Sequence, residues 1–335
     1  MNVLLTCAGR RNYLVEYFKQ AVGARGRVLA ADQSPSAPAL QAADEAYVMP
    51  GVFDPGYVEQ LLTICKSRQV GLVIPLNDLE LPVLAENKAR FCSESIIVVV
   101  SDAAVVNTCF DKYQTLAFAQ KNGIVVPPSY FSPLEARQAL DSGALAFPLV
   151  VKPRWGSASF GVEVCYDEDE LTHVFELAKK RLVRSFVAKL STNMEQCLLI
   201  QPIISGQEYG LDVVNDLAGR HVCTFVKKKL AMRSGETDKA VSIEYPELFE
   251  IGRNIGMRLG HVGNLDLDVC GDDNGLFLID MNPRFGGGYP FSHMAGANVP
   301  AALLAWAEGK QPDPSWLTIS PGVTASKYSK LITVK

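Results

Sequence analysis

The sequence has no apolar run long enough to cross a membrane, and it has no excess of basic charge. Its 32 Lys and Arg residues are outnumbered by 36 Asp and Glu, which gives a formal net charge of −4. A protein that binds duplex nucleic acid is normally basic, so this balance argues against such a partner. We therefore expect no nucleic-acid partner and no membrane span.

Eight cysteines are present, but no two of them form a Cys-x-x-Cys pair, and the histidines have no spacing typical of a zinc site. Most of the cysteines lie inside apolar segments, as Cys65 and Cys197 do. Such residues are normally reduced and packed in the core. We therefore expect a cytoplasmic protein without a disulfide framework.

Two further absences concern catalysis. The first predicted turn has no G-x-G-x-x-G fingerprint, so a nicotinamide-dependent dehydrogenase is poorly supported, although Asp32 ends the second predicted strand. No Ser/His/Asp or Cys/His arrangement supports a covalent nucleophile. Candidate functional residues must therefore come from other polar segments of the chain.

The first hundred residues alternate strand and helix patterns in the manner of a parallel α/β sheet. Strands are predicted at Asn2–Cys7, Arg27–Ala31, Ala46–Val48, Gly71–Leu76 and Ile96–Val100. Helices are predicted at Tyr13–Val22, Pro55–Lys66 and Leu79–Arg90. A chain of 335 residues with 48% hydrophobic content can bury two or three such compact units.

Polar residues follow the first and the fourth of these strands. Ligands of parallel sheets bind beyond the carboxyl ends of the strands. We therefore predict substrate contacts at this rim, from Arg10, Asn77, Asp78 and Glu80. The alternative for Arg10 and its neighbour Arg11 is that they only cap the surface of the first helix.

A loop of small residues follows a predicted strand that ends in Lys152. Gly156 and Ser157 allow backbone N–H groups to approach an anion closely, and Lys152 adds a positive charge beside them. This order favours a phosphate site, and a flexible hairpin tip is the alternative. A later strand, Cys197–Ile204, leaves one predicted domain and turns into the strand Tyr209–Asn215 of the next, which predicts a hinge. Clefts between domains are usual ligand sites.

The segment 263–288 reads as two strands joined by a polar turn. Asp268 precedes Asp280 by twelve residues, so a hairpin would bring the two carboxylates together, and Asn282 and Arg284 would share the face of Asp280. Carboxylate and amide oxygens suit Mg2+ held against phosphates, and the arginine would bind a phosphate or a carboxylate. From this stretch alone, an ordinary solvated acidic hairpin is equally supported.

Three weaker signals remain. The glycine-rich loop 285–290 is expected to be mobile and backbone-exposed, with Gly287 and His293 as candidate substrate contacts, although His293 is equally compatible with a structural role. Lys112 is a lone helical lysine, which on its own carries no weight. The run Lys227–Lys229 is more often a solvated strand end than a binding site.

Four segments taken in order resemble the ATP-grasp superfamily of ATP-dependent ligases. They are FDK at 110–112, FPLVVKPRWGSASFGV at 147–162, LIQPIISGQEYGLDV at 199–213 and LIDMNPRFGGG at 278–288. The resemblance covers nearly the whole chain, and it extends to single-copy proteins related to one synthetase half of the carbamoyl-phosphate synthase large chain and to the pyrrolysine-biosynthesis ligase. The chain departs from the usual pattern at Asp280 and at Gln201, where glutamate is more frequent.

The resemblance implies a three-domain α/β fold. It implies an N-terminal parallel α/β domain at 1–105, a linker helix with a small α+β lid at 106–200, and a C-terminal α+β domain with an antiparallel sheet at 201–335. It also implies ATP contacts through Lys112, Lys152, Gly156, Ser157, Gln201, Ile203, Ile204 and Glu208. Mg2+, or Mn2+ in its place, would be held by Asp268, Asp280 and Asn282.

The implied reaction joins a carboxylate to an amine, or to a thiol, through an acyl phosphate, with release of ADP and phosphate. Arg233 and Arg284 would neutralise the transferred phosphoryl group or the acyl phosphate. The partners would be a small-molecule carboxylate and an amine, and a homodimer is compatible with this family. The alternative is a nucleotide-binding regulatory or scaffold protein without turnover. Which of Lys227, Lys228, Lys229 and Lys239 reaches the phosphates stays open.

Overall fold

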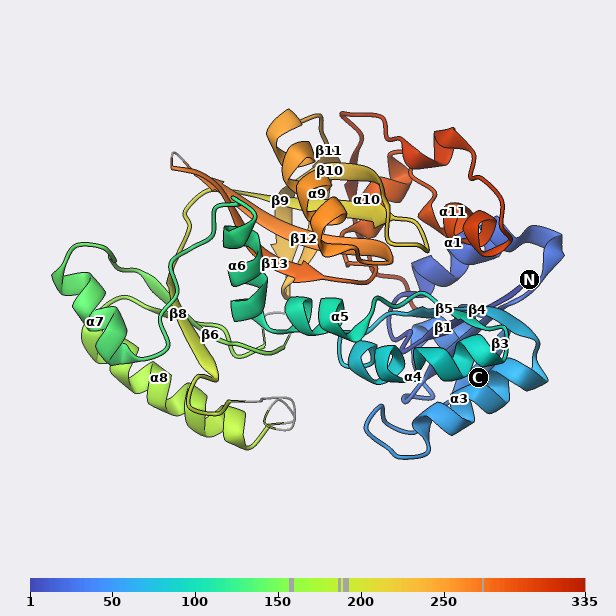
Figure 1. The fold of residues 1–335 in the computed structure, drawn as a ribbon, viewed down its shortest axis with the longest axis horizontal. Coiled ribbons are helices and arrows are strands. Elements are labelled where there is room, and N and C mark those ends of the chain that lie inside the picture. Colours follow the sequence, from blue (N-terminus) through green and yellow to red (C-terminus); the bar gives the residue numbers. More distant parts are fainter. Residues whose placement is uncertain (157–159, 186–187, 189–192, 273, 335) are drawn as a thin grey trace.

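The computed structural model describes residues 1–156, 160–185, 188, 193–272 and 274–334. Three β-sheets follow one another along the chain. Figure 1 shows the N-terminal sheet at the right, a small sheet at the left and the large C-terminal sheet between and above them. The predicted three-domain α/β architecture is therefore confirmed, and the domain boundaries stay predictions.

The N-terminal sheet is parallel, in the strand order β3-β2-β1-β4-β5. Its strands are β1 Asn2–Thr6, β2 Val28–Asp32, β3 Glu45–Val48, β4 Val70–Pro75 and β5 Ile97–Val98. Its helices are α1 Asn12–Val22, α2 Pro38–Ala42, α3 Tyr57–Ser67 and α4 Leu81–Ser93. Apolar clusters lie on both faces of the sheet, so the central strands are almost continuously apolar. All five predicted strands are present, whereas α2 is too short to show a periodic pattern and was not predicted.

The core on the α1 side of this sheet continues into the C-terminal part of the chain. Val3 and Phe18 belong to the same buried cluster as Phe285, Tyr289 and Leu303. Figure 1 shows α1 beside α11, Val299–Ala307, and the two helices are in contact. Apolar packing therefore fixes the N-terminal sheet against the C-terminal part of the molecule.

Two helices, α5 Ala103–Phe110 and α6 Lys112–Lys121, lead to the small sheet. This sheet has the order β7-β6-β8, with β6 Leu149–Pro153, β7 Glu163–Cys165 and β8 Leu198–Pro202, and it is covered by α7 Pro133–Asp141 and α8 Glu168–Val183. We did not predict α8. Its sequence carried usable signals, because Asp167 caps the first turn, acids follow the cap, and Lys180 and Arg181 lie in the last turn.

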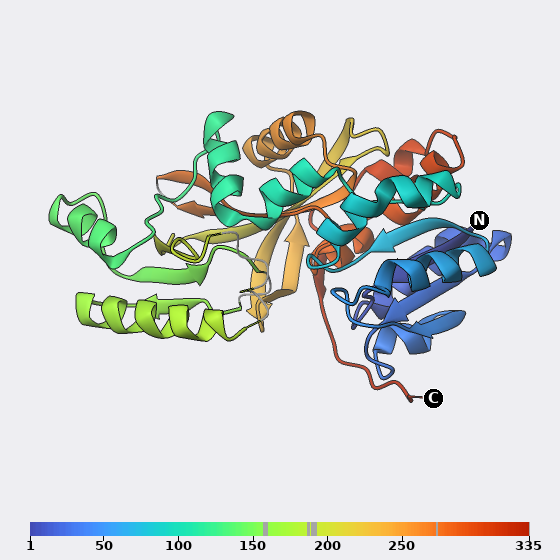
Figure 2. The ribbon, with the colours of Figure 1, turned by 60° about the horizontal axis from the view of Figure 1, so that its bottom comes forward.

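The C-terminal sheet is antiparallel, in the order β13-β12-β9-β10-β11-β14. Its strands are β9 Gln207–Asn215, β10 His221–Arg233, β11 Glu236–Ser242, β12 Gly263–Asp272, β13 Gly275–Asn282 and β14 Thr324–Ser326, and α10 Tyr289–Met294 follows β13. One face is apolar and packs against α6 and α9, Pro246–Leu259, as Figure 2 shows. The opposite face carries charged side chains such as Lys227 and Lys229 together with the apolar Val214 and Phe225, which belong to the cluster shared with the N-terminal sheet. Within the described ranges, no helix combines the length and the apolar character that a bilayer crossing requires.

Two glycines allow α9 to approach the apolar face of this sheet. A Cβ added at Gly252 would lie 2.5 Å from Thr224 Cγ2 and 3.1 Å from Val213 Cγ2. In Gly252→Ala, the gain in helix propensity of about 1 kcal/mol is opposed by overpacking of about 1–3 kcal/mol. We expect a net loss of stability in urea-induced unfolding. Met257→Ala, at an exposed position of the same helix, is the control and should change stability by less than about 0.5 kcal/mol. A Gly252→Ala protein that is more stable than the wild type would contradict this packing.

Candidate functional site

The polar face of the C-terminal sheet brings the predicted metal ligands together. Strands β12 and β13 pair with Asp268 opposite Asp280 and with Asp266 opposite Asn282. Because side chains alternate along a strand, these four lie on one face, and the residues between them are buried on the other face. Like charges directly opposite each other are destabilising. The pair Asp268 and Asp280 therefore needs positive charge nearby.

Two lysines from different elements supply that charge. Lys112, the first residue of α6, places Nζ 2.8 Å from Asp280 Oδ2 and 3.0 Å from Oδ1. Lys229 on β10 places Nζ 2.6 Å from Asp268 Oδ1 and 3.5 Å from Glu208 Oε2. The lysine side chains are 13% and 6% exposed. The run 227–229 is therefore no solvated strand end, and Lys229 is a site residue that we did not single out.

The neighbouring lysine of the run is buried as well. Lys227 Nζ lies 2.6 Å from Asp212 Oδ2, and both side chains are almost fully buried. A Cβ at Gly288 would lie 2.7 Å from Lys227 Cε, and one at Gly286 would lie 2.1 Å from the Asp266 carboxylate. The glycine loop is thus packed directly onto the charged face. Our expectation of a backbone-exposed loop was wrong, because the glycines serve close approach instead. The mobility of the loop stays a prediction.

Lys152 lies on β6 and is 8% exposed. Burial and the charge of Lys112 lower the pKa of Lys152 from 10.5 to about 8, while Asp280 and Asp268 act in the opposite direction. Lys152 therefore shares the electrostatic environment of the two carboxylates, although it belongs to the small sheet. Within the part of the chain that the structure describes, its ammonium group has no ion pair.

The loop after Lys152 begins at a hollow that Lys112 and Asn282 also line. Gly156 has a φ of 124° and lines a small hollow together with Lys112, Asn282 and Asp78. A left-handed φ of this kind favours glycine. Ser157, the other predicted contact of this loop, lies outside the described residues.

The predicted hinge is formed by the end of β8 and the residues after it. Gln201 is buried, and its Nε2 donates to Ser129 Oγ at 2.7 Å. The backbone N–H of Ile203 donates to Pro148 O, and Ile204 O accepts a hydrogen bond from the Cys270 thiol. Of these contacts, the one between Ile204 and Cys270 ties the end of the small sheet to β12 of the large one. Glu208 follows on β9 with a side chain that is 52% exposed.

Arg284 connects this face to the N-terminal rim. Its Nη2 donates to Asp78 Oδ2 at 2.8 Å, and its Nη1 lies 3.4 Å from Asp266 Oδ2. Burial opposes the charged form of Arg284, but Asp78 and Asp266 outweigh it and raise the arginine pKa. Burial and the charge of Asp268 raise the pKa of Asp266 to about 7. The Nε of Arg284 is buried without a hydrogen-bond partner among the described residues.

The second predicted arginine lies elsewhere. Arg233 is exposed at the tip of the β10–β11 hairpin, opposite Glu236 and four residues beyond Lys229. Among the described residues it makes no ion pair with the carboxylates of the site. The structure therefore brings Arg284 to the site but does not bring Arg233 into contact with it.

The predicted rim residues have different environments. Asp78 is held by Arg284, and Arg10 is exposed. Asn77 Oδ1 accepts the backbone N–H of Leu79, so it caps the turn before α4. Glu80 is fully buried and accepts a hydrogen bond from Thr6 Oγ1 at 2.9 Å as well as one from Tyr57. Its carboxyl group is therefore engaged inside the N-terminal domain.

Of the two candidates beyond the hairpin, His293 is engaged in an aromatic contact. Its ring stacks on Tyr17, with the ring centroids 3.6 Å apart, and burial lowers its pKa. Gly287 lies against Glu236, because an added Cβ there would be 3.2 Å from the Glu236 Cδ. The stack between α1 and α10 favours the structural reading of His293.

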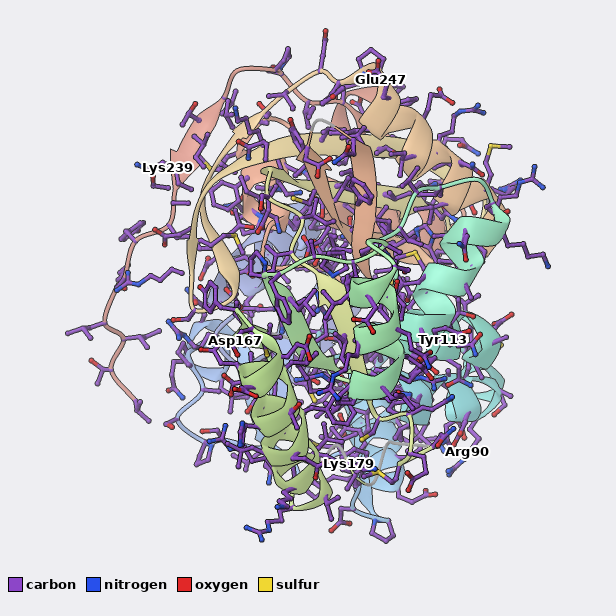
Figure 3. The ribbon with its side chains drawn as sticks, turned by 90° about the vertical axis from the view of Figure 1, so that its left-hand side faces the viewer. Arg90, Tyr113, Asp167, Lys179, Lys239 and Glu247 are labelled. Atoms are coloured by element: carbon purple, nitrogen blue, oxygen red, sulfur yellow. The ribbon has the colours of Figure 1, made fainter. Side chains whose placement is uncertain are left out.

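A buried ion pair that we did not predict holds the start of α6 to the end of β6. Arg154 donates from Nε and Nη2 to the two oxygens of Asp111, both at 2.7 Å. Asp111 also caps α6, and the backbone N–H of Lys112 donates to Arg154 O. The guanidinium group lies 5.2 Å from the ring centroid of Tyr113, which Figure 3 labels beside the helices of the small sheet. This contact fixes Lys112 relative to the strand that carries Lys152.

The predicted metal ligands form a sparse set. Across the ranges that the structure describes, no group of three or more His, Cys, Asp or Glu side chains is placed to hold a metal ion. The predicted set instead has two carboxylates, Asp268 and Asp280, with the amide of Asn282 beside them. All three are oxygen donors on one face, and this chemistry fits Mg2+ that keeps several other ligands.

Two family models match the chain. Residues 3–99 match the model described as "PylC-like, N-terminal domain", and residues 194–330 match the model described as "ATP-grasp in the biosynthetic pathway with Ter operon". The chain is 21% identical over 266 residues to the carbamoyl phosphate synthase large chain of Rhodopirellula baltica, covering 76% of this chain and 23% of that one. It is 30% identical over 138 residues to the D-alanine–D-alanine ligase of Thermotoga petrophila, covering 41% and 43%. The chain thus spans less than half of these curated relatives.

Solved structures share the fold. The biotin carboxylase domain dimer of the Hydrogenobacter thermophilus 2-oxoglutarate carboxylase, in complex with MgADP, ADP and bicarbonate, aligns with a TM-score of 0.70 at 19% identity. The alignment covers 92% of this chain and 70% of that one. The N5-carboxyaminoimidazole ribonucleotide synthetase of Thermotoga maritima aligns with a TM-score of 0.65 at 17% identity, covering 93% and 77%.

The buried carboxyl group of Glu80 predicts a pH dependence of stability. Burial raises its pKa from 4.5 to about 7, although hydrogen bonds from Tyr57 and Thr6 act in the opposite direction. A raised folded-state pKa stabilises the protein below about pH 4.5, and this contribution is lost as the pH rises to about 7. We expect the free energy of unfolding of wild type, relative to Glu80→Gln, to fall by up to about 3 kcal/mol across this range. A difference between the two proteins that does not vary with pH would contradict this.

The pair between Asp111 and Arg154 predicts a large effect of a small change. Asp111→Asn keeps a side chain that can cap α6 but removes the charge facing the buried guanidinium group. Breaking a buried pair costs about 3–5 kcal/mol, and the neighbouring rings should keep the loss near the lower end. Arg137→Gln removes an ion pair on the surface of the same unit and should cost below about 1 kcal/mol in the same unfolding measurement. Equal losses of unfolding free energy in the two variants would show that the buried pair stabilises the protein no more than the surface pair does.

Proposed function

We propose that this chain, which belongs to the ATP-grasp superfamily and carries a PylC-like N-terminal domain, is an ATP-dependent ligase. It joins a small-molecule carboxylate to an amine, or to a thiol, through an acyl phosphate. The family models and the fold support the superfamily, and the reaction is our inference from the site. The observation that carries it is the convergence of lysines from separate elements on the opposed pair Asp268 and Asp280.

Phosphoryl transfer depends mainly on positioning and on neutralising charge, and the site supplies both. Lys112, Lys152 and Lys229 would bind the phosphates of ATP, each from a different structural element. Gly156 would let the loop backbone approach them. Gln201, Ile203 and Ile204 would place adenine at the hinge, and Glu208 would accept the ribose hydroxyls. The 52% exposure of the Glu208 side chain is compatible with that contact.

Mg2+, which the fold family implies, would be held by Asp268, Asp280 and Asn282. When bound, it would neutralise charge on the phosphates. The buried Nε of Arg284, which has no partner in the described part of the chain, would serve as a donor to the acyl phosphate. Arg233 would need to approach from the hairpin tip to act in the same way.

In the first step, a carboxylate oxygen of the substrate forms a bond to the γ-phosphorus, and the bond from that phosphorus to ADP breaks. In the second step, the amine forms a bond to the acyl carbon, phosphate leaves, and the amine loses a proton. The rim of Arg10, Asn77 and Asp78 lies at the carboxyl ends of the N-terminal strands, and Asp78 pairs with Arg284. We place the substrate there.

A nucleotide-binding protein without turnover is the second candidate. Such a protein would keep the nucleotide cleft, but it would not need an intact set of phosphate-binding lysines and metal-binding carboxylates. The chain keeps Lys112, Lys152, Asp268 and Asp280, and three of them form ion pairs within the site. This set favours the ligase.

Asp280→Asn tests the reaction. The change preserves shape but removes one of the two opposed charges, so kcat should fall by about 10²–10³, as expected for the loss of one preorganised charge contact. ATP should still bind through the lysines and the hinge with modestly lower affinity. Release of ADP is measured with pools of amino acids and dicarboxylates, and hydroxylamine is added to trap an acyl phosphate as a hydroxamate.

The control is Asp272→Asn, at the other end of the same hairpin, which should keep wild-type turnover. Wild type should yield a hydroxamate in the presence of its carboxylate substrate, and Asp280→Asn should not. Full turnover in Asp280→Asn would refute the metal assignment. ADP release by the wild type without any hydroxamate would refute the acyl phosphate.

A further inference from the structure

The two carboxylates proposed to bind the metal are each in direct contact with an ammonium group. Lys112 Nζ contacts both oxygens of Asp280, at 2.8 and 3.0 Å. Lys229 Nζ contacts Asp268 at 2.6 Å. The lysine side chains are 13% and 6% exposed, and those of Asp280 and Asp268 are 18% and 37% exposed, so solvent screens the Asp280 contact less than the Asp268 contact. Lys112 thus occupies both oxygens of Asp280, and Lys229 occupies one oxygen of Asp268.

The same lysines are the ones that the phosphates of ATP would require. An ammonium group in closest contact with a carboxylate occupies the oxygens that a metal ion would bind. The same ammonium group in contact with a phosphate leaves the carboxylate available to the metal ion. A divalent cation and the two lysines therefore compete for the oxygens of Asp268 and Asp280. Phosphate oxygens relieve this competition, because they accept the lysines and leave the carboxylates to the metal.

We propose that Lys112 and Lys229 are internal counter-ions that exclude a divalent cation from Asp268 and Asp280 until nucleotide phosphates take over the ammonium groups. The proposal rests on the proposed function, since it assigns the phosphates to the same lysines. It makes the binding of metal and nucleotide mutually dependent, because a coupling between two ligands is reciprocal.

The surroundings of the two lysines allow such an exchange. Lys112 lies in the first turn of α6 at the edge of the hollow that Gly156 and Asn282 also line. Lys229 passes over Gly210, where an added Cβ would lie 3.6 Å from the lysine Cε. The exchange therefore requires lysine side chains to reorient and does not require a strand to move.

The test measures metal binding alone, on the full-length protein freed of nucleotide. Mn2+ is the probe, and its unbound form is followed by electron paramagnetic resonance. Lys112→Met and Lys229→Met remove the ammonium groups and keep most of the side-chain length. Each should bind Mn2+ about tenfold more tightly than the wild type, because a cation at contact distance from a carboxylate has been removed. Binding of ATP with Mg2+ should weaken in the same variants.

Two lysines provide matched controls. Lys152 is buried close to the same carboxylates but makes no ion pair with them in the described part of the chain, so Lys152→Met should raise Mn2+ affinity much less. Lys179, which pairs with Glu195 on the surface of α8, should have no effect when changed to Met. Lys112→Gln and Lys229→Gln serve where a Met variant does not fold.

Tighter Mn2+ binding in Lys112→Met and Lys229→Met, but not in Lys152→Met, would support the exchange. Unchanged Mn2+ affinity in both variants, or an equal increase in Lys152→Met, would overturn it. Tight Mn2+ binding by the wild type without nucleotide would overturn it as well. Binding of ATP by the wild type is measured in parallel, and its absence would refute the proposed function rather than the exchange alone.

Discussion

Two carboxylates held directly opposite each other across a strand pair are the constraint around which this molecule is arranged. Asp268 and Asp280 cannot separate without unpairing β12 from β13. Their repulsion must be balanced by positive charge, and that charge comes from outside the hairpin. Lys229 comes from the next strand but one in the sheet, and Lys112 comes from a helix that precedes the hairpin by some 150 residues. This charged face thus forms only when elements from distant parts of the chain fold together.

Burying lysine side chains on one face of a sheet requires room for them. A long side chain needs room to cross its neighbours, and residues without a Cβ provide that room at Gly210 and Gly288. An added Cβ at either position would approach a lysine methylene group to 3.1 Å or less. Sequence reasoning took the glycines after Arg284 for a mobile loop, because local patterns do not show what packs above them. In the structure they are the surface against which the charged layer is buried.

The sequence allowed prediction of those features that depend on local periodicity. The five N-terminal strands and the pairing of Asp268 with Asp280 follow from apolar patterns and from the length of one turn. Features that depend on contacts between residues far apart in the sequence could not be predicted. The bidentate contact between Asp111 and Arg154 joins residues 43 positions apart, and neither residue type signals a partner. Likewise, the burial of Glu80 depends on Tyr57 and Thr6, which belong to other elements.

The division of the cores suggests which parts of the site stay fixed. The N-terminal sheet shares one buried cluster with the C-terminal part of the chain, so the rim at Asp78 and the face at Arg284 are held together by packing as well as by their ion pair. The small sheet has a separate core of its own. Its main ties to the other parts are α6, the hinge after β8, and the contact between Arg154 and Asp111. A closing motion in an enzyme of this design would therefore move Lys152 with the small sheet. The carboxylates and the rim at Asp78 would keep their relation to each other. Because Asp111 anchors Arg154 next to Lys112, and Lys112 contacts Asp280, this contact restrains the strand that carries Lys152 relative to the two carboxylates.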